Sequence, residues 1–562
     1  MLLIKAGVRR TNHKKDNESG GIMKKTPNAL LTSLIICSLV LSGVTPVWAE
    51  AVSGSAADSV LSAVTASEDT QGAERAAAVQ LQRDGWAPDV KKAVNEFVAQ
   101  YGNTSSAYSE TPYVVSDFDN TCSIFDVEEQ LAVYQLQQMV FGFTPEQLPD
   151  ILATGLSDLE TPREGYALDE KSHSYSDWIS DITAAYTRLY QSYGPFTAEG
   201  PSGKAGLDEI QSDPQWMEFA AKMRAMYDLV YDNESASVAY PWVLYWFTGL
   251  SEDEVYRLAY DSHSTYKEVE TSTVDWVSPE DIDSAVGQVE YEWTSGTQVT
   301  ENIREMFTAY AESGINVWIC SASCTDAIRA AVDVWGLHDC VTGVIAMTNK
   351  VKDGKYVNEY DYETGYAWYT QEKDGWKRGD VATGAQTQGP GKVTAIDNVL
   401  VSSYGHGPIA GFMDSTGDYD FCTVYDSLKL VICFNRASRK VTDGGGVIGE
   451  LAIYQRDTLG YNLKKANDAG DTLYVLQGRD ENGLRTLRSS NSTLTYGATE
   501  EKLFKNEENE AQLQYMVDHT MTTEEVINTF APKTAEDDAD NVLGFAYGFS
   551  ADYEGYHSHQ DQ

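Results

Sequence analysis

Five short apolar runs, each the length of one buried strand, alternate with longer helical patterns along this 562-residue chain. The runs cover residues 113–116, 315–320, 343–347, 408–413 and 428–434. Helical patterns lie between them, at about 300–313, 325–335 and 390–400. Because strands that alternate with helices form a parallel sheet with helices on its faces, we predict an α/β fold with a Rossmann-like parallel sheet.

The chain between the first and second runs is far longer than a crossover helix requires. It contains helical patterns at 213–231 and 251–260 and many aromatic residues. We predict a core made of residues 81–121 and 300–440, interrupted by a large, mostly helical domain at 122–299. Residues 441–562 are predicted to form a C-terminal α/β extension, whose role the sequence does not indicate.

Residues 1–49 are predicted to contain an export signal that begins at Met23, and residues 1–22 are predicted to come from a start codon assigned too far upstream. Residues 23–49 begin Met-Lys-Lys, continue with an apolar run at 29–44 and end on Ala49, which is the order of a secretory signal peptide. Residues 50–80 are rich in small and acidic residues and are predicted to be a flexible spacer. We therefore expect a secreted or cell-surface protein with no membrane span in the mature chain. An uncleaved anchor is the alternative, although the apolar run is short for a span.

The chain carries 85 acidic and 41 basic residues, a formal net charge of −44. Nucleic acids and anionic membranes would be repelled over much of such a surface, so we expect neither as a partner. Six of the seven cysteines follow residue 49, and Cys320, Cys422 and Cys433 lie in or beside apolar runs. We expect buried free thiols rather than disulfides. The sequence leaves the oligomeric state open.

The first apolar run leads straight into two carboxylates, Asp117 and Asp119. Ligands bind at the carboxyl ends of strands in open α/β sheets, so both side chains are placed where chemistry occurs. Two carboxylates this close favour a divalent cation between them or a raised pKa in one of them. Asp117 could attack phosphorus as a nucleophile, and Asp119 could protonate the leaving alcohol and later deprotonate water. Taken alone, such a pair could also be a solvated turn.

The segment Asp117-Phe-Asp-Asn-Thr121 resembles the first motif of the haloacid dehalogenase superfamily. Three later segments resemble the remaining motifs in the superfamily's order: Ser321 after a strand, Lys392 opening a helix, and residues 412–419 with Asp414 and Asp418. A methionine stands before Asp414, where the superfamily commonly has glycine. The resemblance implies the following roles: catalysis by Asp117 and Asp119; phosphate binding by Thr121, Ser321, Ala322 and Lys392; and Mg²⁺ binding by Asp117, Asp119, Asp414 and Asp418.

The domain at 122–299 resembles the superfamily's caps, which close over the site and select the leaving group. Its beginning, with Asp126, Glu128 and Glu129, is similar to the caps of phosphoserine phosphatases and secreted phosphorylcholine phosphatases, in which acids at this position face an ammonium group. The resemblance implies a Mg²⁺-dependent phosphomonoesterase acting on a small phosphate ester, amine-bearing such as phosphorylcholine. A broad-specificity acid phosphatase and a non-catalytic surface binding protein with this fold are the alternatives.

Overall fold

A computed structural model of the chain describes residues 78–106, 108, 111–360, 365–373, 375–380 and 384–532. The predicted signal peptide, the predicted spacer up to residue 77 and the last thirty residues of the C-terminal extension lie outside the described residues. Among the helices of the described ranges, none combines the length and hydrophobicity that crossing a bilayer requires.

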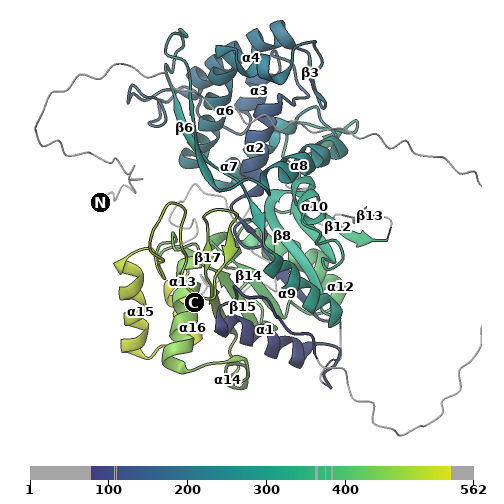
Figure 1. Cartoon of the computed structure of the whole chain (residues 1–562), viewed down its shortest axis with the longest axis vertical. Helices are drawn as coiled ribbons and strands as arrows, with labels where there is room; N and C mark the ends of the chain where they lie inside the picture. Colours follow the sequence, from purple (N-terminus) through teal and green to yellow (C-terminus); the bar gives the residue numbers. More distant parts are fainter. Residues whose placement is uncertain are drawn as a thin grey trace, which may run out of the picture. The chain divides into compact units, whose positions relative to one another are not determined.

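An eight-stranded sheet forms the centre of the core, in the order β13-β12-β9-β8-β1-β14-β15-β16. The six strands from β9 to β16 run parallel to one another, and β12 and β13 add an antiparallel hairpin beyond β9 (Figure 1). The predicted α/β fold with a parallel sheet is confirmed. The strands are β1 (Tyr113–Ser116), β8 (Asn316–Cys324), β9 (Gly343–Met347), β12 (Tyr366–Glu372), β13 (Gly375–Arg378), β14 (Ala410–Met413), β15 (Leu430–Phe434) and β16 (Leu473–Gln477).

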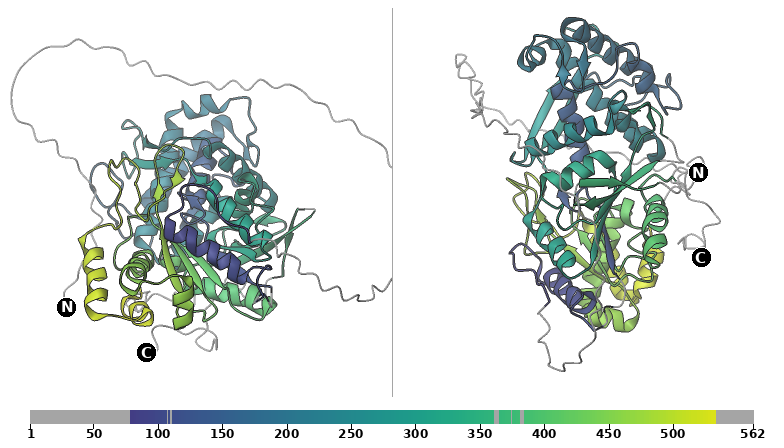
Figure 2. Two further views of the ribbon diagram at one scale, coloured as in Figure 1. Left: turned by 60° about the horizontal axis from the view of Figure 1, so that its bottom comes forward. Right: turned by 90° about the vertical axis from the view of Figure 1, so that its right-hand side faces the viewer.

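Helices cover both faces of this sheet (Figure 2). Side chains alternate between the faces of a strand, so Val114 packs in one buried cluster and its neighbours Tyr113 and Val115 in another. The first cluster includes α1 (Pro88–Tyr101), α9 (Glu301–Glu312), α10 (Thr325–Val334) and α14 (Leu463–Ala469). The second includes α11 (Pro390–Ile396), the π-helical turn η2 (Asp397–Val401), α13 (Gly444–Tyr454), α15 (Glu507–His519) and α16 (Thr523–Phe530).

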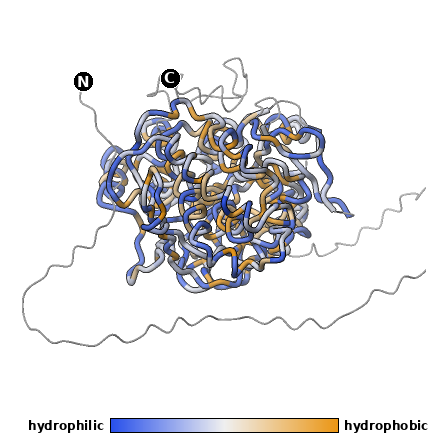
Figure 3. Tube along the Cα trace, turned by 90° about the horizontal axis from the view of Figure 1, so that it is seen from above, coloured by the Kyte–Doolittle hydropathy of each residue, from blue (hydrophilic) through white to orange (hydrophobic). Residues whose placement is uncertain are grey.

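The insertion between β1 and β8 is mostly helical and has a large buried cluster of its own, which continues onto α10. The tube in Figure 3 shows hydrophobic stretches running through the interior. The helices of the insertion are α2 (Val127–Gln138), α3 (Leu148–Ala153), α4 (Tyr175–Tyr193), α5 (Leu207–Gln211), α6 (Pro214–Asn233), α7 (Ala236–Trp242), η1 (Val243–Phe247) and α8 (Glu252–Tyr266). Its strands are β2 (Ser123–Ile124), β3 (Phe196–Thr197), β4 (Gly200–Pro201), β5 (Ser272–Val277), β6 (Glu290–Ser295) and β7 (Gln298–Val299).

The chain after residue 440 contributes to the core sheet itself, because β16 pairs with β15 along five residues. A small hairpin, β17 (Arg479–Asp480) and β18 (Thr486–Leu487), follows directly. The described cysteines are buried with free thiols, as expected. The remaining short elements are β10 (Val351–Lys352), β11 (Lys355–Tyr356), α12 (Ser402–Tyr404), η3 (Thr416–Asp418) and η4 (Gln455–Leu459).

Candidate active site

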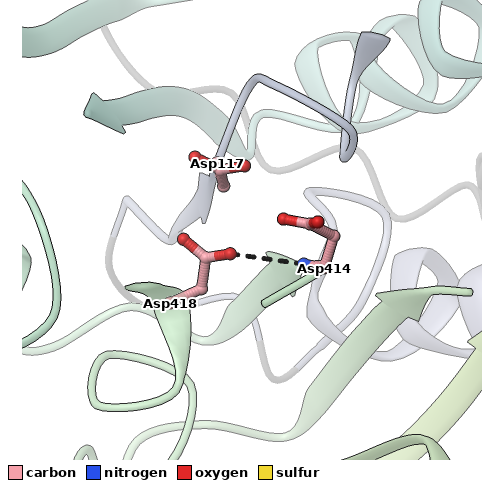
Figure 4. Close-up of side chains that lie close together, drawn as sticks. All are labelled: Asp117, Asp414 and Asp418. Atoms are coloured by element: carbon pink, nitrogen blue, oxygen red, sulfur yellow. Dashed lines mark hydrogen bonds between the residues drawn. The ribbon is translucent and has the colours of Figure 1, made fainter. Parts of the chain in front are cut away.

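Three buried aspartates meet at the carboxyl ends of β1 and β14 (Figure 4). Asp117 follows β1, and its N–H donates to the carbonyl of Phe412 in β14 at 3.1 Å. Asp414 follows β14, and Asp418 lies in η3 with its carboxylate accepting from the Asp414 N–H at 3.2 Å. One carboxylate oxygen from each aspartate lies within 4.8 Å of the others. Such a set of oxygens fits a small divalent cation.

Lys392 carries the positive charge nearest to this group. Its Nζ lies 2.7 Å from Asp117 Oδ1 and 2.6 Å from Asp418 Oδ1, and its side chain is 1% exposed. Burial, then repulsion by Asp117, raises the pKa of Asp418 to about 7, although Lys392 opposes the shift. Lys392 is thus shared between two carboxylates, Asp117 and Asp418, and a divalent cation bound beside it would add positive charge where these two carboxylates repel each other.

Asp414 has a second set of cationic partners that the sequence did not predict. Its Oδ2 accepts from Arg439 Nη2 at 2.9 Å and from Arg436 Nη1 at 3.2 Å. Burial alone would raise the pKa of Asp414, but Arg439 and Arg436 outweigh it and lower that pKa. Asp414 is therefore held as a carboxylate, the form that binds a metal.

Asp119, which was also predicted to bind the metal, lies outside the group of three aspartates. Its Oδ1 accepts from the N–H of Val127 at 2.7 Å, and its Oδ2 accepts from Ser323 Oγ at 2.7 Å. Burial, followed by repulsion from Asp126 and Asp117, raises the pKa of Asp119 well above its ordinary value. A carboxyl group with a raised pKa is suited to act as a general acid.

The residues predicted to bind phosphate divide into two groups. Ser321, Ala322 and Lys392 line a cavity of about 540 Å³, together with Asp117 and Asp119. The Ser321 hydroxyl accepts from the N–H of Ser323 at 3.1 Å. Burial raises the pKa of Asp117, and Lys392 and then the hydroxyl of the buried Thr121 oppose that shift. Thr121 does not line the cavity.

The three acids proposed for substrate recognition all line this cavity, but they differ in their hydrogen bonds. Asp126 caps α2, accepting from the N–H groups of Glu128 and Glu129. Glu128 is buried, and its Oε1 accepts from the N–H of Cys324 at 3.0 Å. Glu129 has a 55% exposed side chain, and its Oε2 lies 3.7 Å from Arg224 Nη2. Among these acids, Glu129 is the one best placed to meet a ligand.

Comparisons with known proteins support the fold. No protein-family model matches the chain, and no curated protein does. A solved structure of a protein of unknown function from Anaerococcus prevotii is similar over 74% of this chain and 98% of its own, with 24% identity and a TM-score of 0.58. At this identity the likeness shows a shared fold.

Two weaker likenesses were found. One is to a protein of unknown function from Bordetella pertussis Tohama I, at 11% identity and a TM-score of 0.29, over 58% of this chain and 91% of the other. The second is to a cytosolic 5′-nucleotidase IIIB bound to cytidine, at 15% identity and a TM-score of 0.24, over 62% and 78% of the two chains.

The cavity is also lined by Arg224, which was not predicted from the sequence. Its guanidinium is 2% exposed, pairs with Asp228 Oδ1 at 2.5 Å and lies 4.7 Å from the ring centres of Tyr227 and Tyr291. The available signal was its place in the helical pattern at 213–231, where a cation stands among small and apolar residues. Such a residue is buried only when it is paired, and here the pairing occurs at the cavity.

Proposed function

We propose that this protein is a Mg²⁺-dependent phosphomonoesterase of the haloacid dehalogenase type. The observation that carries the proposal is the buried Lys392 between Asp117 and Asp418, at the carboxyl ends of parallel strands and open to a small-molecule cavity. A cation and carboxylates in such a place suit phosphoryl transfer, which needs charge stabilisation around the transferred group.

In the proposed reaction, Lys392 and the Ser321 hydroxyl hold the phosphate oxygens of the ester. Asp117 attacks phosphorus, and the bond from phosphorus to the alcohol oxygen breaks as Asp119 gives that oxygen its proton. Asp119 then takes a proton from water, whose oxygen attacks the aspartyl-phosphate and releases inorganic phosphate. Mg²⁺ bound by Asp117, Asp414 and Asp418 would supply charge neutralisation for the carboxylates and the phosphate.

We further propose that the substrate is a small amine-bearing ester such as phosphorylcholine. Nine carboxylates and four basic side chains line the cavity, which favours a cationic leaving group. Glu129 is an exposed carboxylate that lines the cavity, and we assign it to the ammonium. Arg224 already lies over a face of Tyr227 and a face of Tyr291. We therefore propose that Glu129, more than these two rings, binds the ammonium group of the substrate.

The predicted signal peptide supports a location outside the cytoplasm, either secreted or at the cell surface. The test of the function is phosphate release by the chain from residue 50 onward, with Mg²⁺. The panel contains phosphorylcholine, phosphorylethanolamine, phosphoserine, glycerol phosphate, a sugar phosphate and p-nitrophenyl phosphate. A preference of about tenfold in kcat/KM for the amine esters supports the substrate assignment. A flat profile would indicate a broad-specificity phosphatase, and no release from any ester would contradict the enzyme assignment.

A further inference from the structure

A buried arginine from the C-terminal part of the chain reaches the loop that carries both candidate catalytic aspartates. Arg479 lies in β17, just after the edge strand β16, and is 1% exposed. Its Nη1 donates to the carbonyl oxygen of Asn120 at 2.9 Å, and its Nη2 donates to Asn120 Oδ1 at 3.2 Å. The guanidinium therefore holds the backbone and the side chain of the residue that follows Asp119.

The guanidinium is fixed from its other side by Glu481. Arg479 Nε and Nη2 both donate to Glu481 Oε1, at 2.9 and 2.7 Å. The second oxygen of Glu481 accepts from the N–H of Tyr496 at 3.1 Å. A planar guanidinium bonded along two edges has little freedom to turn, so Arg479 presents its donors to Asn120 in one orientation.

The backbone of Asn120 has a φ of +63°, in the left-handed region. Asparagine adopts this region more readily than most residues other than glycine, but it still has a conformational cost there. The loop that Asn120 continues carries two aspartates with different partners: Asp117 faces Lys392, whereas Asp119 faces Ser323 and the start of α2. Strained conformations persist where the surroundings determine them, and here Arg479 is bonded to the strained residue itself.

We infer that Arg479 is a positioning residue for proton transfer: through Asn120 it keeps Asp119 where its proton can reach the oxygen of the leaving alcohol. The inference rests on the proposed phosphatase function and adds to it a role for the C-terminal segment. Arg479 does not itself touch the reacting atoms in this assignment. The proton passes from the Asp119 carboxyl to the ester oxygen as the bond from phosphorus to that oxygen breaks.

The test compares two esters that differ in their need for that proton. Glycerol phosphate releases an alkoxide that must be protonated, whereas p-nitrophenyl phosphate releases a stable phenolate. In Arg479→Lys, which keeps the charge but not the two-edged bonding, kcat/KM for glycerol phosphate should fall about 10²-fold, the usual size of a general-acid contribution. For p-nitrophenyl phosphate, kcat/KM should fall less than about threefold, because the phenolate leaves without needing a proton from a general acid.

Arg485→Lys is the matched control. Arg485 is also a buried arginine of this segment, but its Nη atoms donate to Thr271 Oγ1 and to the carbonyls of Val269 and Thr297, none of which belongs to the catalytic loop 117–121. This variant should change both esters equally or not at all. Thermal unfolding of each variant shows whether it is folded. If Arg479→Lys does not fold, Glu481→Gln, which frees one edge of the guanidinium, is measured in its place and should show the same selective loss.

Equal losses on the two esters, or no loss on either, would overturn the positioning role while leaving the phosphatase assignment intact. A wild-type chain that releases phosphate from neither ester would overturn the phosphatase assignment, and the positioning role with it. A loss confined to glycerol phosphate in Arg479→Lys or Glu481→Gln, and absent from Arg485→Lys, supports the role.

Discussion

Lys392 Nζ lies 2.7 Å from Asp117 Oδ1, and both side chains are buried. The same nitrogen lies 2.6 Å from Asp418 Oδ1, so the ammonium has a second carboxylate partner. The carboxylates raise the pKa of Lys392 against the effect of burial, so Lys392 stays charged across the physiological range. The proposed nucleophile, Asp117, is thus paired with a cation that remains charged, and this cation would still have Asp418 as a partner if Asp117 were replaced.

The first prediction is that Asp117→Asn abolishes turnover and leaves the protein folded. An amide cannot attack phosphorus, so phosphate release should fall by at least about 10³-fold. Lys392 keeps Asp418 as its partner, so the melting temperature should stay within a few degrees of the wild type. Phosphate-release assays and thermal unfolding measure the two effects, with Asp426→Asn at an exposed position as the control. Retained activity would remove Asp117 from the role of nucleophile.

The second prediction concerns the close approach of α13 to Asp414. A Cβ at Gly445 would lie 1.9 Å from the Asp414 carbonyl oxygen, so Gly445→Ala forces backbone to move beside a proposed metal ligand. We expect the free energy of unfolding to fall by about 1–3 kcal/mol, as for other overpacked sites, and Mg²⁺ binding to weaken. Denaturant unfolding and Mg²⁺ titration measure these changes.

Gly449→Ala, in the same helix, is the control for that experiment. A Cβ there would lie 3.4 Å from Leu476 Cδ1, an ordinary contact. Because alanine favours a helix over glycine by up to about 1 kcal/mol, this variant should be as stable as the wild type or more so. Equal behaviour of the two variants would show that the contact with Asp414 does not matter.

The third prediction is that activity depends on a divalent cation. EDTA should stop phosphate release, and added Mg²⁺ should restore it, because carboxylate oxygens of Asp117, Asp414 and Asp418 lie within 4.8 Å of one another, an arrangement that fits a small divalent cation. Mg²⁺ should also raise the melting temperature, since a ligand that binds the folded state stabilises it. Asp418→Asn should reduce that shift. An enzyme insensitive to EDTA would contradict the metal assignment.

The sequence predicted well those features that are local. Asp117 and Asp414 follow apolar strands and Lys392 lies near the start of α11, so each is marked by its own neighbours. Ser321 was predicted to follow a strand but lies inside β8, which continues to Cys324. The structure places all four residues around one cavity. The parallel order of the sheet followed from the alternation of strands and helices. These signals need no knowledge of distant contacts.

The missed features depend on contacts between distant segments. Arg479 is 359 positions from Asn120, and nothing in its own neighbourhood indicates that it reaches the catalytic loop. Arg436 and Arg439 read as ordinary surface cations until β14 and β15 pair and bring them to Asp414. Strand β16 was missed because a short apolar run after residue 440 is consistent with either a strand or a buried helix segment.

The fourth prediction concerns the dependence of stability on pH. Burial raises the pKa of Glu450 in α13 to about 8, against the hydrogen bonds donated by Asn509 and Gln512. Between pH 4.5 and about pH 8, the Glu450 carboxyl is therefore protonated in the folded protein and ionised in the unfolded chain. The stabilisation is complete below the unfolded pKa and is lost as pH rises through about 8.

Glu450→Gln tests that prediction because it keeps the shape and removes the titration. Between pH 4.5 and about pH 8, the unfolding free energy of the wild type should fall relative to that of the variant. The expected fall is about 1 kcal/mol for each unit by which the pH rises. Denaturant unfolding at several pH values measures it. A difference that does not vary with pH would contradict the assignment to Glu450.

The last prediction concerns substrate selection by Glu129. Its carboxylate is exposed to the cavity, and its 3.7 Å ion pair with Arg224 is looser than the 2.5 Å pair of Arg224 with Asp228, so an incoming ammonium can compete for it. Glu129→Gln should raise KM for phosphorylcholine about tenfold and leave p-nitrophenyl phosphate almost unchanged. The melting temperature should change little, because the buried Arg224 keeps Asp228 as its closer partner. Glu292→Gln, which removes another carboxylate from the same cavity, is the matched control and should have a smaller effect. Equal effects of the two variants on phosphorylcholine would indicate that the overall charge of the cavity, rather than Glu129, attracts the substrate.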